Sequence, residues 1–330
     1  MKDIRIIIVG FGIIGRGVAE TLVWKRQFFR SRLGVNVVVS AVCEVSGCLV
    51  PPGGVDLEKA LSTPLPKIEG WKDAKTKDVI RETEADVVVE LTPGNIQSGE
   101  PGLSHILGSL AAGKHVVTSN KAPLAVAYRR IMEEAAKKER RVRFEATVGG
   151  AIPIMNLMEY CLQANEVSHA YGILNGTTNY ILSKMAEDGV SLESALKEAQ
   201  DLGYAEPDPK YDIEGVDSAA KVVILANALL GKDVSYKDMK VTGIREITPE
   251  SVELAKKHGY VVKLVGDVVR QDVSPRLVPI SHPLNVSGSL NALMLNTDIA
   301  GDITLIGRGA GARETSSSIL SDILAIASRI

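Results

Sequence analysis

The chain has 330 residues, of which 45% are hydrophobic, 24% are charged and 4% are aromatic, and its formal net charge is -2. One hydrophobic core rarely serves so long a chain, so we expect two domains. The lack of a basic excess and the few aromatic side chains exclude the usual nucleic-acid-binding surface, which needs positive charge and stacking rings. The expected partner is a small molecule.

The N-terminal segment begins a strand at once and shows no signal-peptide pattern. No apolar run approaches the roughly 20 residues that a membrane-spanning helix needs. Three cysteines, Cys43, Cys48 and Cys161, are too few and too irregularly spaced for a disulfide framework or a zinc site. We therefore expect a cytoplasmic protein without a membrane partner.

A dinucleotide-binding loop is predicted near the N-terminus. A β-branched run at residues 4–9 precedes Gly-Phe-Gly-Ile-Ile-Gly at residues 10–15, and an amphipathic helical pattern follows. This order of strand, glycine turn and helix is the setting of the dinucleotide fingerprint. Gly10 would permit the tight turn, Gly12 the approach of a pyrophosphate and Gly15 the close packing of helix on strand. A glycine turn that packs a helix on a sheet without a ligand is the alternative.

The second predicted strand, residues 35–42, leads to Cys43 and Glu44. A carboxylate at this place suits the ribose hydroxyls of NAD and repels the 2′-phosphate of NADP. No arginine follows closely, so we favour NAD over NADP. Glu44 lies further from the glycines than is usual, and an ordinary loop residue is the alternative.

Two further strands, residues 86–91 and 115–118, are predicted to end beside polar side chains. Thr92 follows the first, and Ser119 and Lys121 follow the second. Open α/β sheets bind ligands at the carboxyl ends of their strands, so we expect nicotinamide and substrate to meet there. Lys121 could also be a plain lysine at a helix start.

Residues 145–153 have the sequence Glu-Ala-Thr-Val-Gly-Gly-Ala-Ile-Pro, which leads into an apolar helix that ends near Cys161. Carbonyls exposed by glycines beside a carboxylate are able to hold a monovalent cation. A tight crossover between two domains explains the glycines as simply, and the residues alone favour the crossover.

The rest of the chain alternates strands and helices without a parallel-sheet pattern. Helices are expected after Asn175 and Ser191 and from Pro249 to His258, and strands at residues 167–174, 260–269, 276–280 and 289–295. An open sheet of this kind is able to serve as a dimer face.

A second glycine-rich loop, residues 305–312, lacks a well-formed preceding strand and the spacing of a dinucleotide fingerprint. We therefore expect no second nucleotide site, and we expect the last helix to pack on the first domain. The glycine turn either touches the cofactor or has no ligand.

The chemistry is expected in residues 203–221, where five carboxylates lie in a Gly/Pro-rich loop before Lys221. Asp217 and Lys221, at i and i+4, would share one helix face. The apolar run that follows would bury the lysine, and burial makes a lysine suited to proton transfer. An ordinary surface ion pair fits the same spacing.

The sequence thus predicts an α/β fold with three parts. Residues 1–150 would form a Rossmann-type, doubly wound parallel sheet that binds the dinucleotide. Residues 151–305 would form an α+β domain for substrate binding and dimerisation. Residues 306–330 would be a glycine turn and a helix that return to the first domain.

Nearly the whole chain resembles homoserine dehydrogenase. The resemblance rests on six segments: residues 10–15, 119–121, 145–153, 174–180, 203–221 and 307–311. It implies an NAD(P)-dependent oxidoreductase that interconverts L-homoserine and L-aspartate 4-semialdehyde in threonine, methionine and isoleucine biosynthesis, and a homodimer.

The resemblance also implies residue roles. Lys221 would be the acid/base with Asp217 beside it, while Glu206, Asp217 and Lys121 would bind substrate. Cofactor contacts would come from Gly10, Gly12, Ile13, Ile14, Gly15, Glu44, Thr92, Ser119, Lys121, Gly203 and Gly307, and a sodium ion would be held by Glu145 with the backbone of Val148, Gly150 and Ile152.

The chain departs from the family in two places. Residues 312–316 are Ala-Arg-Glu-Thr-Ser, where a more apolar, proline-containing continuation is expected. No regulatory domain follows the last helix, so we expect no threonine feedback through such a domain.

Two other functions compete with this interpretation. A phosphorylating semialdehyde dehydrogenase would need a cysteine nucleophile, which is missing at the domain junction. A non-catalytic dinucleotide sensor would have no use for Lys221.

Overall fold

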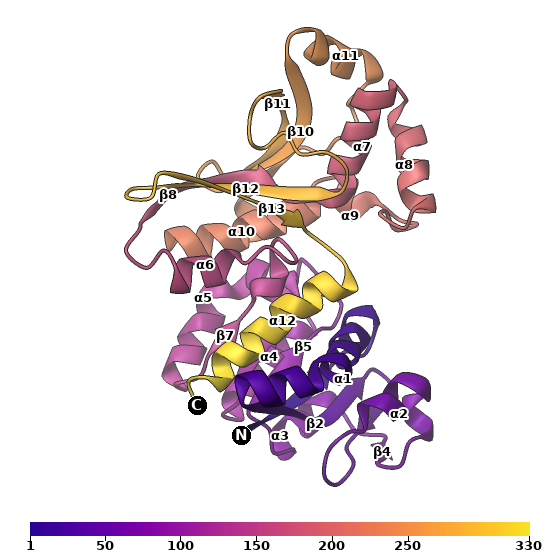
Figure 1. Ribbon diagram of the computed structural model, residues 1–330, viewed down its shortest axis with the longest axis vertical. Helices are drawn as coiled ribbons and strands as arrows, with labels where there is room; N and C mark the ends of the chain where they lie inside the picture. The colour runs from indigo at the N-terminus through magenta and orange to yellow at the C-terminus, as the bar shows by residue number, and fades with distance from the viewer. The chain divides into compact units, whose positions relative to one another are not determined.

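The structure is a computed structural model that describes residues 1–330 (Figure 1). Contacts divide the chain into two compact units. The first unit comprises Met1–Thr147 with Gly311–Ile330, and the second comprises Val148–Ala310. These limits stand close to the boundaries at 150 and 305 that the sequence predicts. None of the helices has the length and apolar content that crossing a membrane would require.

The first unit is built on a seven-stranded sheet with the order β4-β3-β2-β1-β5-β6-β7. Strands β2, β1, β5, β6 and β7 run parallel, whereas β3 and β4 pair antiparallel. The strands are β1 (Lys2–Val9), β2 (Val35–Glu44), β3 (Gly47–Leu49), β4 (Trp71–Lys72), β5 (Val87–Glu90), β6 (His115–Thr118) and β7 (Val142–Arg143). The parallel core confirms the doubly wound fold class.

Helices of the first unit connect these strands. They are α1 (Ile13–Leu33), α2 (Leu57–Ser62), α3 (Thr76–Glu82), α4 (Gly102–Ala111), α5 (Lys121–Lys137) and α12 (Ala312–Ala327), with 3-10 turns η1 (Leu65–Lys67) and η2 (Glu145–Thr147). Because successive connections leave β1 in opposite directions along the sheet, the strand order reverses between β1 and β5. Ligands of open α/β sheets bind at such a switch point.

The C-terminal helix α12 packs beside α1 in the first unit, as expected (Figure 1). Gly17 of α1 makes the close approach possible, because a Cβ there would lie 3.2 Å from the Cβ of Ala312. Ile319 and Ile323 of α12 are fully buried in the same hydrophobic cluster as Val18. The last helix therefore completes the core of the dinucleotide-binding unit.

A buried ion pair also fixes α12. One carboxylate oxygen of Asp322 accepts a hydrogen bond of 2.8 Å from Arg143 Nε, and the other accepts one of 2.8 Å from the backbone N–H of Glu145. The side chains of Arg143 and Asp322 are only 8% and 1% exposed. Since neither charge has access to water, each depends on the other.

The second unit is built on a mixed six-stranded sheet with the order β13-β12-β8-β10-β11-β9. Its strands are β8 (Val167–Ile173), β9 (Lys240–Val241), β10 (Tyr260–Asp267), β11 (Asp272–Pro279), β12 (Leu290–Thr297) and β13 (Asp302–Arg308). Its helices are α6 (Ile154–Tyr160), α7 (Gly176–Asp188), α8 (Leu192–Asp201), α9 (Lys210–Ile213), α10 (Val216–Leu230) and α11 (Pro249–Lys257), and the segment Tyr236–Asp238 forms the 3-10 turn η3. This is the expected α+β class.

One sequence prediction about this unit is wrong. A well-formed strand, β13, does precede the second glycine loop, and it pairs antiparallel with β12 from Asp302 to Arg308. Its residues are all half-buried or exposed at the edge of the sheet, so the apolar pattern is weak. Because β13 is antiparallel and enters a mixed sheet, the loop still lacks the setting of a second dinucleotide fingerprint.

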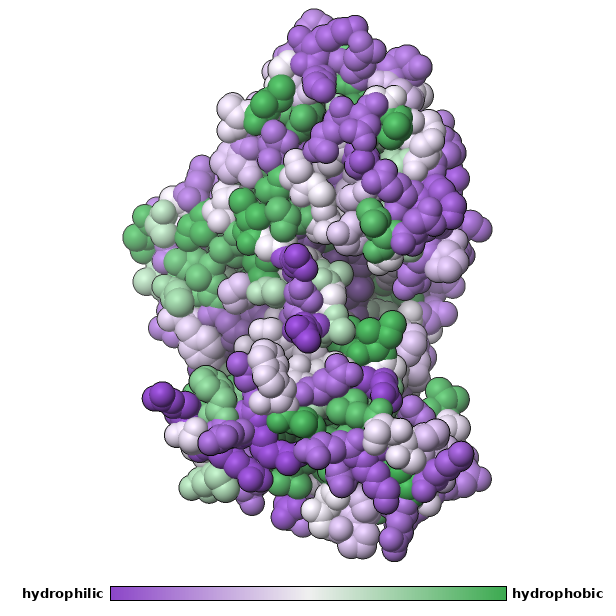
Figure 2. All heavy atoms as spheres, turned by 45° about the vertical axis from the view of Figure 1, so that its right-hand side comes forward, coloured by the Kyte–Doolittle hydropathy of each residue, from purple (hydrophilic) through white to green (hydrophobic).

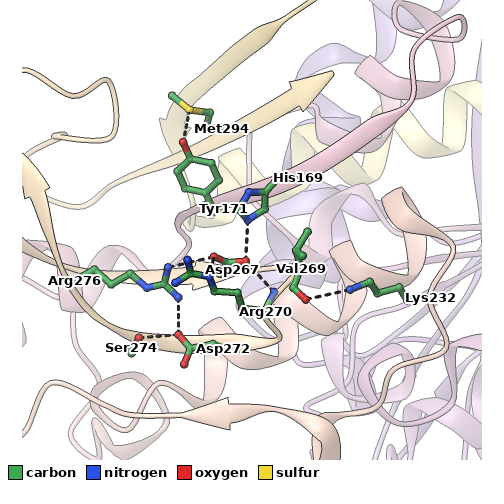
Figure 3. A network of polar contacts seen from close by, with 10 residues as sticks. All are labelled: His169, Tyr171, Lys232, Asp267, Val269, Arg270, Asp272, Ser274, Arg276 and Met294. Carbon is green, nitrogen blue, oxygen red and sulfur yellow. Dashed lines mark hydrogen bonds and ion pairs between the residues drawn. The ribbon is translucent and has the colours of Figure 1, made fainter. Parts of the chain in front are cut away.

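The two faces of this sheet differ. On one face lies α10, whose Val222 would lie 2.6 Å from a Cβ at Gly266. The other face carries a polar network (Figure 3), in which Asp267 accepts hydrogen bonds from His169 Nε2 at 2.8 Å and from Arg276 at 3.2 Å. Burial raises the pKa of Asp267, but hydrogen bonds from the Arg270 backbone and from His169 outweigh it, and the net shift is downward.

We predict that Asp322→Ala destabilises the first unit by about 3 kcal/mol, because it removes the buried carboxylate that pairs with Arg143 and accepts from the backbone of Glu145. Glu253→Ala is the matched control, since Glu253 pairs with Lys257 at 2.7 Å but both side chains are about two thirds exposed, at 65% and 66%. Removing that surface pair should cost about 0.5 kcal/mol or less. Urea denaturation followed by circular dichroism measures both, and equal losses would contradict a structural role for the buried pair.

Candidate functional site

The glycine loop after β1 has the geometry of an anion-binding loop. Gly10 has a φ of +96°, and a Cβ at Gly15 would collide with the carbonyl oxygen of Gly10. Helix α1 begins at Ile13 with Gly12 as N-cap, without a side-chain cap and without an acidic residue in its first turn. No atom lies within 4 Å of a Cβ position at Gly12. The helix N-terminus is thus open to a pyrophosphate, and the loop fits a dinucleotide.

A hollow of about 360 Å³ lies beside this loop, lined by Phe11, Arg16 and Glu44 and by residues 61–66. Arg16 holds its guanidinium 5.7 Å from the centre of the Phe11 ring and donates a hydrogen bond of 2.5 Å to the carbonyl of Leu61. A carboxylate and a guanidinium therefore share the hollow. The sequence prediction considered only arginines that follow Glu44, and it missed Arg16, which follows Gly15.

The structure brings Thr92, Ser119 and Lys121 to adjacent strand ends, because β5 and β6 pair in parallel. The backbone N–H of Ser119 donates to the carbonyl of Glu90 at 3.3 Å. Lys121 is the first residue of α5, which Asn120 caps by accepting from the backbone N–H of Ala122 at 3.1 Å. Thr92 turns its hydroxyl toward the buried carboxylate of Glu90 and donates to it.

The predicted pair of Asp217 and Lys221 exists on α10. Lys221 Nζ lies 2.7 Å from Asp217 Oδ2 and donates a second hydrogen bond of 2.6 Å to the carbonyl of Leu174. Both side chains are only 8% exposed. This burial excludes the alternative of an ordinary surface ion pair, and it is the environment in which a lysine takes part in proton transfer.

Two residues that the sequence prediction did not assign to the site join this pair. Asn175, the N-cap of α7, donates from Nδ2 to Asp217 Oδ2 at 3.0 Å and to Asp212 Oδ1 at 2.7 Å. Burial, and then repulsion by Asp217, raise the pKa of Asp212. Asn175 thus connects Asp212 to the pair of Asp217 and Lys221. The segment at residues 174–180 carried the signal for Asn175, which we interpreted only as a helix cap.

The other predicted site residues of the second unit lie on segments beside this cluster, since Gly307 pairs with Asn291, which donates to the same Leu174 carbonyl as Lys221, and Tyr204 accepts from Thr177. The side chain of Glu206 is exposed, in the loop between α8 and α9, where its carbonyl accepts from Gln200. Gly203 precedes it in the same loop with a φ of +76°. Gly307 lies in β13, where a Cβ would come within 2.9 Å of Ile152.

The predicted sodium site draws on both units, with Glu145 in the first and Val148, Gly150 and Ile152 in the second. No group of three or more His, Cys, Asp or Glu side chains is arranged to hold a metal ion. A cation here would therefore rest mainly on backbone carbonyl oxygens, which suit hard cations. Gly150 has a φ of +58° and is packed so closely that a Cβ would lie 2.7 Å from the carbonyl oxygen of Arg308.

The cysteines offer no nucleophile at the junction of the units. Cys43 and Cys48 are buried opposite one another in the β2–β3 pair. Hydrogen bonding with Cys48, and then burial, raise the pKa of the Cys43 thiol. Cys161 is exposed, but it lies at the end of α6 rather than at its start. A mechanism through a cysteine adduct has no residue to begin it.

Comparisons with protein families match two segments of the chain. Residues 10–145 match the family "Homoserine dehydrogenase, NAD binding domain", and residues 153–324 match "Homoserine dehydrogenase".

Whole proteins are also similar. The homoserine dehydrogenase of Methanocaldococcus jannaschii is 49% identical over 331 residues, which covers 97% of this chain and 98% of that protein. The NAD(+)-dependent homoserine dehydrogenase of Pseudomonas canavaninivorans is 33% identical, with 99% and 97% covered. A crystal structure of a putative homoserine dehydrogenase from Archaeoglobus fulgidus superposes with a TM-score of 0.90 at 44% identity, with 98% and 99% covered. A hyperthermophilic archaeal homoserine dehydrogenase in complex with NADPH gives 0.85 at 29% identity, with 99% and 98% covered.

Proposed function

The chain belongs to the homoserine dehydrogenase family, an oxidoreductase of amino-acid biosynthesis that uses NAD or NADP to interconvert L-homoserine and L-aspartate 4-semialdehyde, and from this premise we propose which residues perform the reaction. The buried Asp217–Lys221 pair carries the proposal. Bound nicotinamide supplies or accepts the hydride, so the protein has to position the carbon–oxygen group and move one proton.

Lys221 is the proposed general acid and base. A charged lysine has three N–H donors, and Asp217 and Leu174 occupy two of them. The third is available to the substrate oxygen, to which it donates when the aldehyde is reduced and from which Lys221 takes the proton when the alcohol is oxidised. Asp217 fixes the direction of the ammonium group by accepting one of its hydrogen bonds.

Asn175 supports the pair by donating a hydrogen bond to the oxygen of Asp217 that Lys221 also contacts.

The proposed substrate contacts are complementary in charge to homoserine. Glu206 and Asp217 bind the ammonium and hydroxyl ends of homoserine, and Lys121 binds its carboxylate. Asp212 lies next to this set through Asn175, and its raised pKa follows from the carboxylate beside it.

For the cofactor, we propose that Gly10, Gly12, Ile13, Ile14 and Gly15 hold the pyrophosphate. We propose that the nicotinamide end is contacted by Thr92, Ser119 and Lys121 of the first unit and by Gly203 and Gly307 of the second. Glu44 supports a preference for NAD, since its carboxylate lines the hollow beside the glycine loop and suits ribose hydroxyls. Arg16 in the same hollow is the group that would bind a 2′-phosphate if Glu44 did not repel it.

We propose in addition a sodium ion at Glu145, Val148, Gly150 and Ile152, a cytoplasmic location and a homodimer. The cation is supported by the hard oxygen atoms that a backbone turn offers. A cytoplasmic location is supported by the place of the reaction among small metabolites of amino-acid biosynthesis.

The homodimer is supported by the sheet of the second unit. Figure 2 shows hydrophobic side chains (green) gathered among polar ones on one face of the molecule, and in the second unit Ile306 is 52% exposed. Ile306 lies in β13, the edge strand of this sheet, and pairs with the buried Ala292 of β12. An open sheet edge that carries an exposed apolar side chain is able to pair with a second copy of the chain.

We predict that Lys221→Ala lowers kcat at least 10²-fold, as loss of a general acid does, and leaves dinucleotide affinity unchanged. Lys232→Ala is the matched control, because Lys232 also donates to a backbone carbonyl, that of Val269, but from an exposed position (Figure 3). Formation of reduced cofactor from homoserine measures kcat. Near-normal turnover in Lys221→Ala would contradict the assignment.

We predict that Glu44→Gln raises the ratio of kcat/KM for NADP to that for NAD about 10-fold or more, since a charged hydrogen bond to a 2′-phosphate becomes available to Arg16. In the double variant Glu44→Gln with Arg16→Gln, the gain should disappear. Initial rates with both cofactors test this, and an unchanged ratio in the single variant would remove Glu44 from cofactor selection.

We predict that Ile306→Asp halves the particle mass measured by light scattering after gel filtration, because a buried charge would break an apolar interface. Ile299→Asp is the control, since Ile299 is 70% exposed in the turn between β12 and β13. A wild-type protein with the mass of one chain would refute the dimer, and a dimeric Ile306→Asp variant would refute this face.

A further inference from the structure

The carboxylate of Glu90 has no role in the proposed reaction, yet it lies where the reaction is proposed. Glu90 is the last residue of β5, and it is 0% exposed. A carboxylate removed from water needs hydrogen-bond donors around it, because burying it alone costs far more than a fold can supply. The donors around Glu90 therefore show what the residue holds.

Three donor groups already bind this carboxylate. The backbone N–H of Thr92 donates to Oε1 at 3.1 Å, and the Thr92 hydroxyl donates to the same oxygen. The hydroxyl of Thr118, the last residue of β6, shares its one proton between Glu90 Oε2 at 3.2 Å and the Glu90 carbonyl oxygen at 3.0 Å. The same hydroxyl accepts from the backbone N–H of Asn120 at 3.0 Å. Glu90 thus connects the loop after β5 with the segment after β6.

Two more buried nitrogen atoms near the carboxylate have no hydrogen-bond partner. His105 Nδ1 of α4 lies 3.6 Å from Oε1, and both this atom and Asn120 Nδ2 are buried and unpaired. A Cβ at Gly102 would lie 3.1 Å from Glu90 Oε2 and 2.6 Å from Asn120 Nδ2. Because Gly102 has no side chain, the carboxylate of Glu90 and the amide of Asn120 both fit against α4 at this position. We call Glu90, Thr92, Thr118, His105 and Asn120 the carboxylate hub.

The hub lies directly beneath three proposed ligand contacts. Thr92 belongs to the hub itself, Ser119 stands between two of its members, and Lys121 follows Asn120, whose side chain caps α5. The carboxylate therefore sets the spacing between the two strand-end loops at the switch-point edge of the sheet. Ligand-facing loops held in this way need little reordering when a ligand binds.

We infer that Glu90 is a positioning residue for hydride transfer, which holds Thr92, Ser119 and Lys121 at the distances that align the nicotinamide end of the cofactor. This inference rests on the proposed function, because it takes those three residues as cofactor and substrate contacts. It differs from a role in stability, since it concerns the nicotinamide end alone. The adenosine end is held by the glycine loop and the hollow beside Glu44, and the hub meets that loop only where the backbone of Thr92 passes Gly10.

The test is Glu90→Gln, which keeps the size of the side chain but replaces one acceptor oxygen by an NH₂ group that faces donors. We expect kcat to fall about 10-fold to 100-fold, as a small misplacement of reacting groups does. The KM for homoserine and the Kd for ADP-ribose, which lacks nicotinamide, should stay within about threefold of the wild type, because binding at the adenosine end is untouched. The emission of bound NADH should change, since it reports the surroundings of the nicotinamide ring.

Matched variants separate positioning from folding. Asp86→Asn makes the same kind of change near the other end of β5, where Asp86 accepts from the backbone N–H of Arg5 at 2.7 Å, and it should leave kcat and NADH emission unchanged. Thr118→Val removes a hydroxyl donor from the hub and should repeat the loss in kcat. Thr118→Ser keeps that hydroxyl and should restore most of it.

Either of two results would overturn the inference. One is wild-type kcat and NADH emission in Glu90→Gln. The other is a parallel loss of ADP-ribose binding and thermal stability, which would make Glu90 a purely structural residue. NADH emission needs no homoserine, so it tests the hub even if the roles given to Lys221 and Asp217 fail, and those roles are tested separately by Lys221→Ala.

Discussion

The buried ammonium group of Lys221 imposes the strictest requirement on the second unit. With 8% of its side chain exposed, it has to find oxygen atoms within the protein, and it finds them in Asp217 and in the carbonyl of Leu174. That carbonyl ends the segment after β8 and also accepts from Asn291 of β12. One lysine therefore ties α10 to two strands of the sheet. The fully buried run after it in α10 keeps water away from the pair.

A buried charge of the opposite sign organises the first unit. Glu90 collects donors from the loop after β5 and from the segment after β6, as Lys221 collects acceptors from α10 and the end of β8. In both units the charge sits at a strand end, where the backbone leaves the sheet and its polar groups need partners. The hydrogen bonds that satisfy the buried charge therefore also hold the ligand-binding loop in place. In this way reactive side chains lie on loops that remain rigid.

The sequence was sufficient where a short segment determines the geometry. The glycine loop and the Asp217–Lys221 pair follow from local spacing, and both have the predicted form. Contacts between distant segments were out of reach. Asn175 meets Asp217 across 42 positions, and Arg16 lies beside Glu44 because β1 and β2 pair in parallel up to Val9 and Cys43. No local pattern distinguishes such residues from ordinary caps and surface charges.

Two other features that the sequence analysis did not predict, β13 and the burial of Glu90, have a different physical cause. Strand β13 lies at a sheet edge and none of its residues is buried, so it lacks the continuous apolar run that marks a buried strand. Glu90 ends an apolar strand, and burial of its charge depends on hydroxyls that follow two strands. A sequence shows that a carboxylate stands there, but not that it is 0% exposed.

The account depends most on the third N–H of Lys221, which it assigns to the substrate. A crystal structure of the protein with oxidised cofactor and L-homoserine tests this directly. The account predicts the homoserine hydroxyl oxygen about 2.6 to 3.2 Å from Lys221 Nζ, the range of a productive proton transfer, with Asp217 and Leu174 still bound to the same nitrogen. A homoserine molecule whose hydroxyl contacts another side chain, with Lys221 turned away, would contradict it.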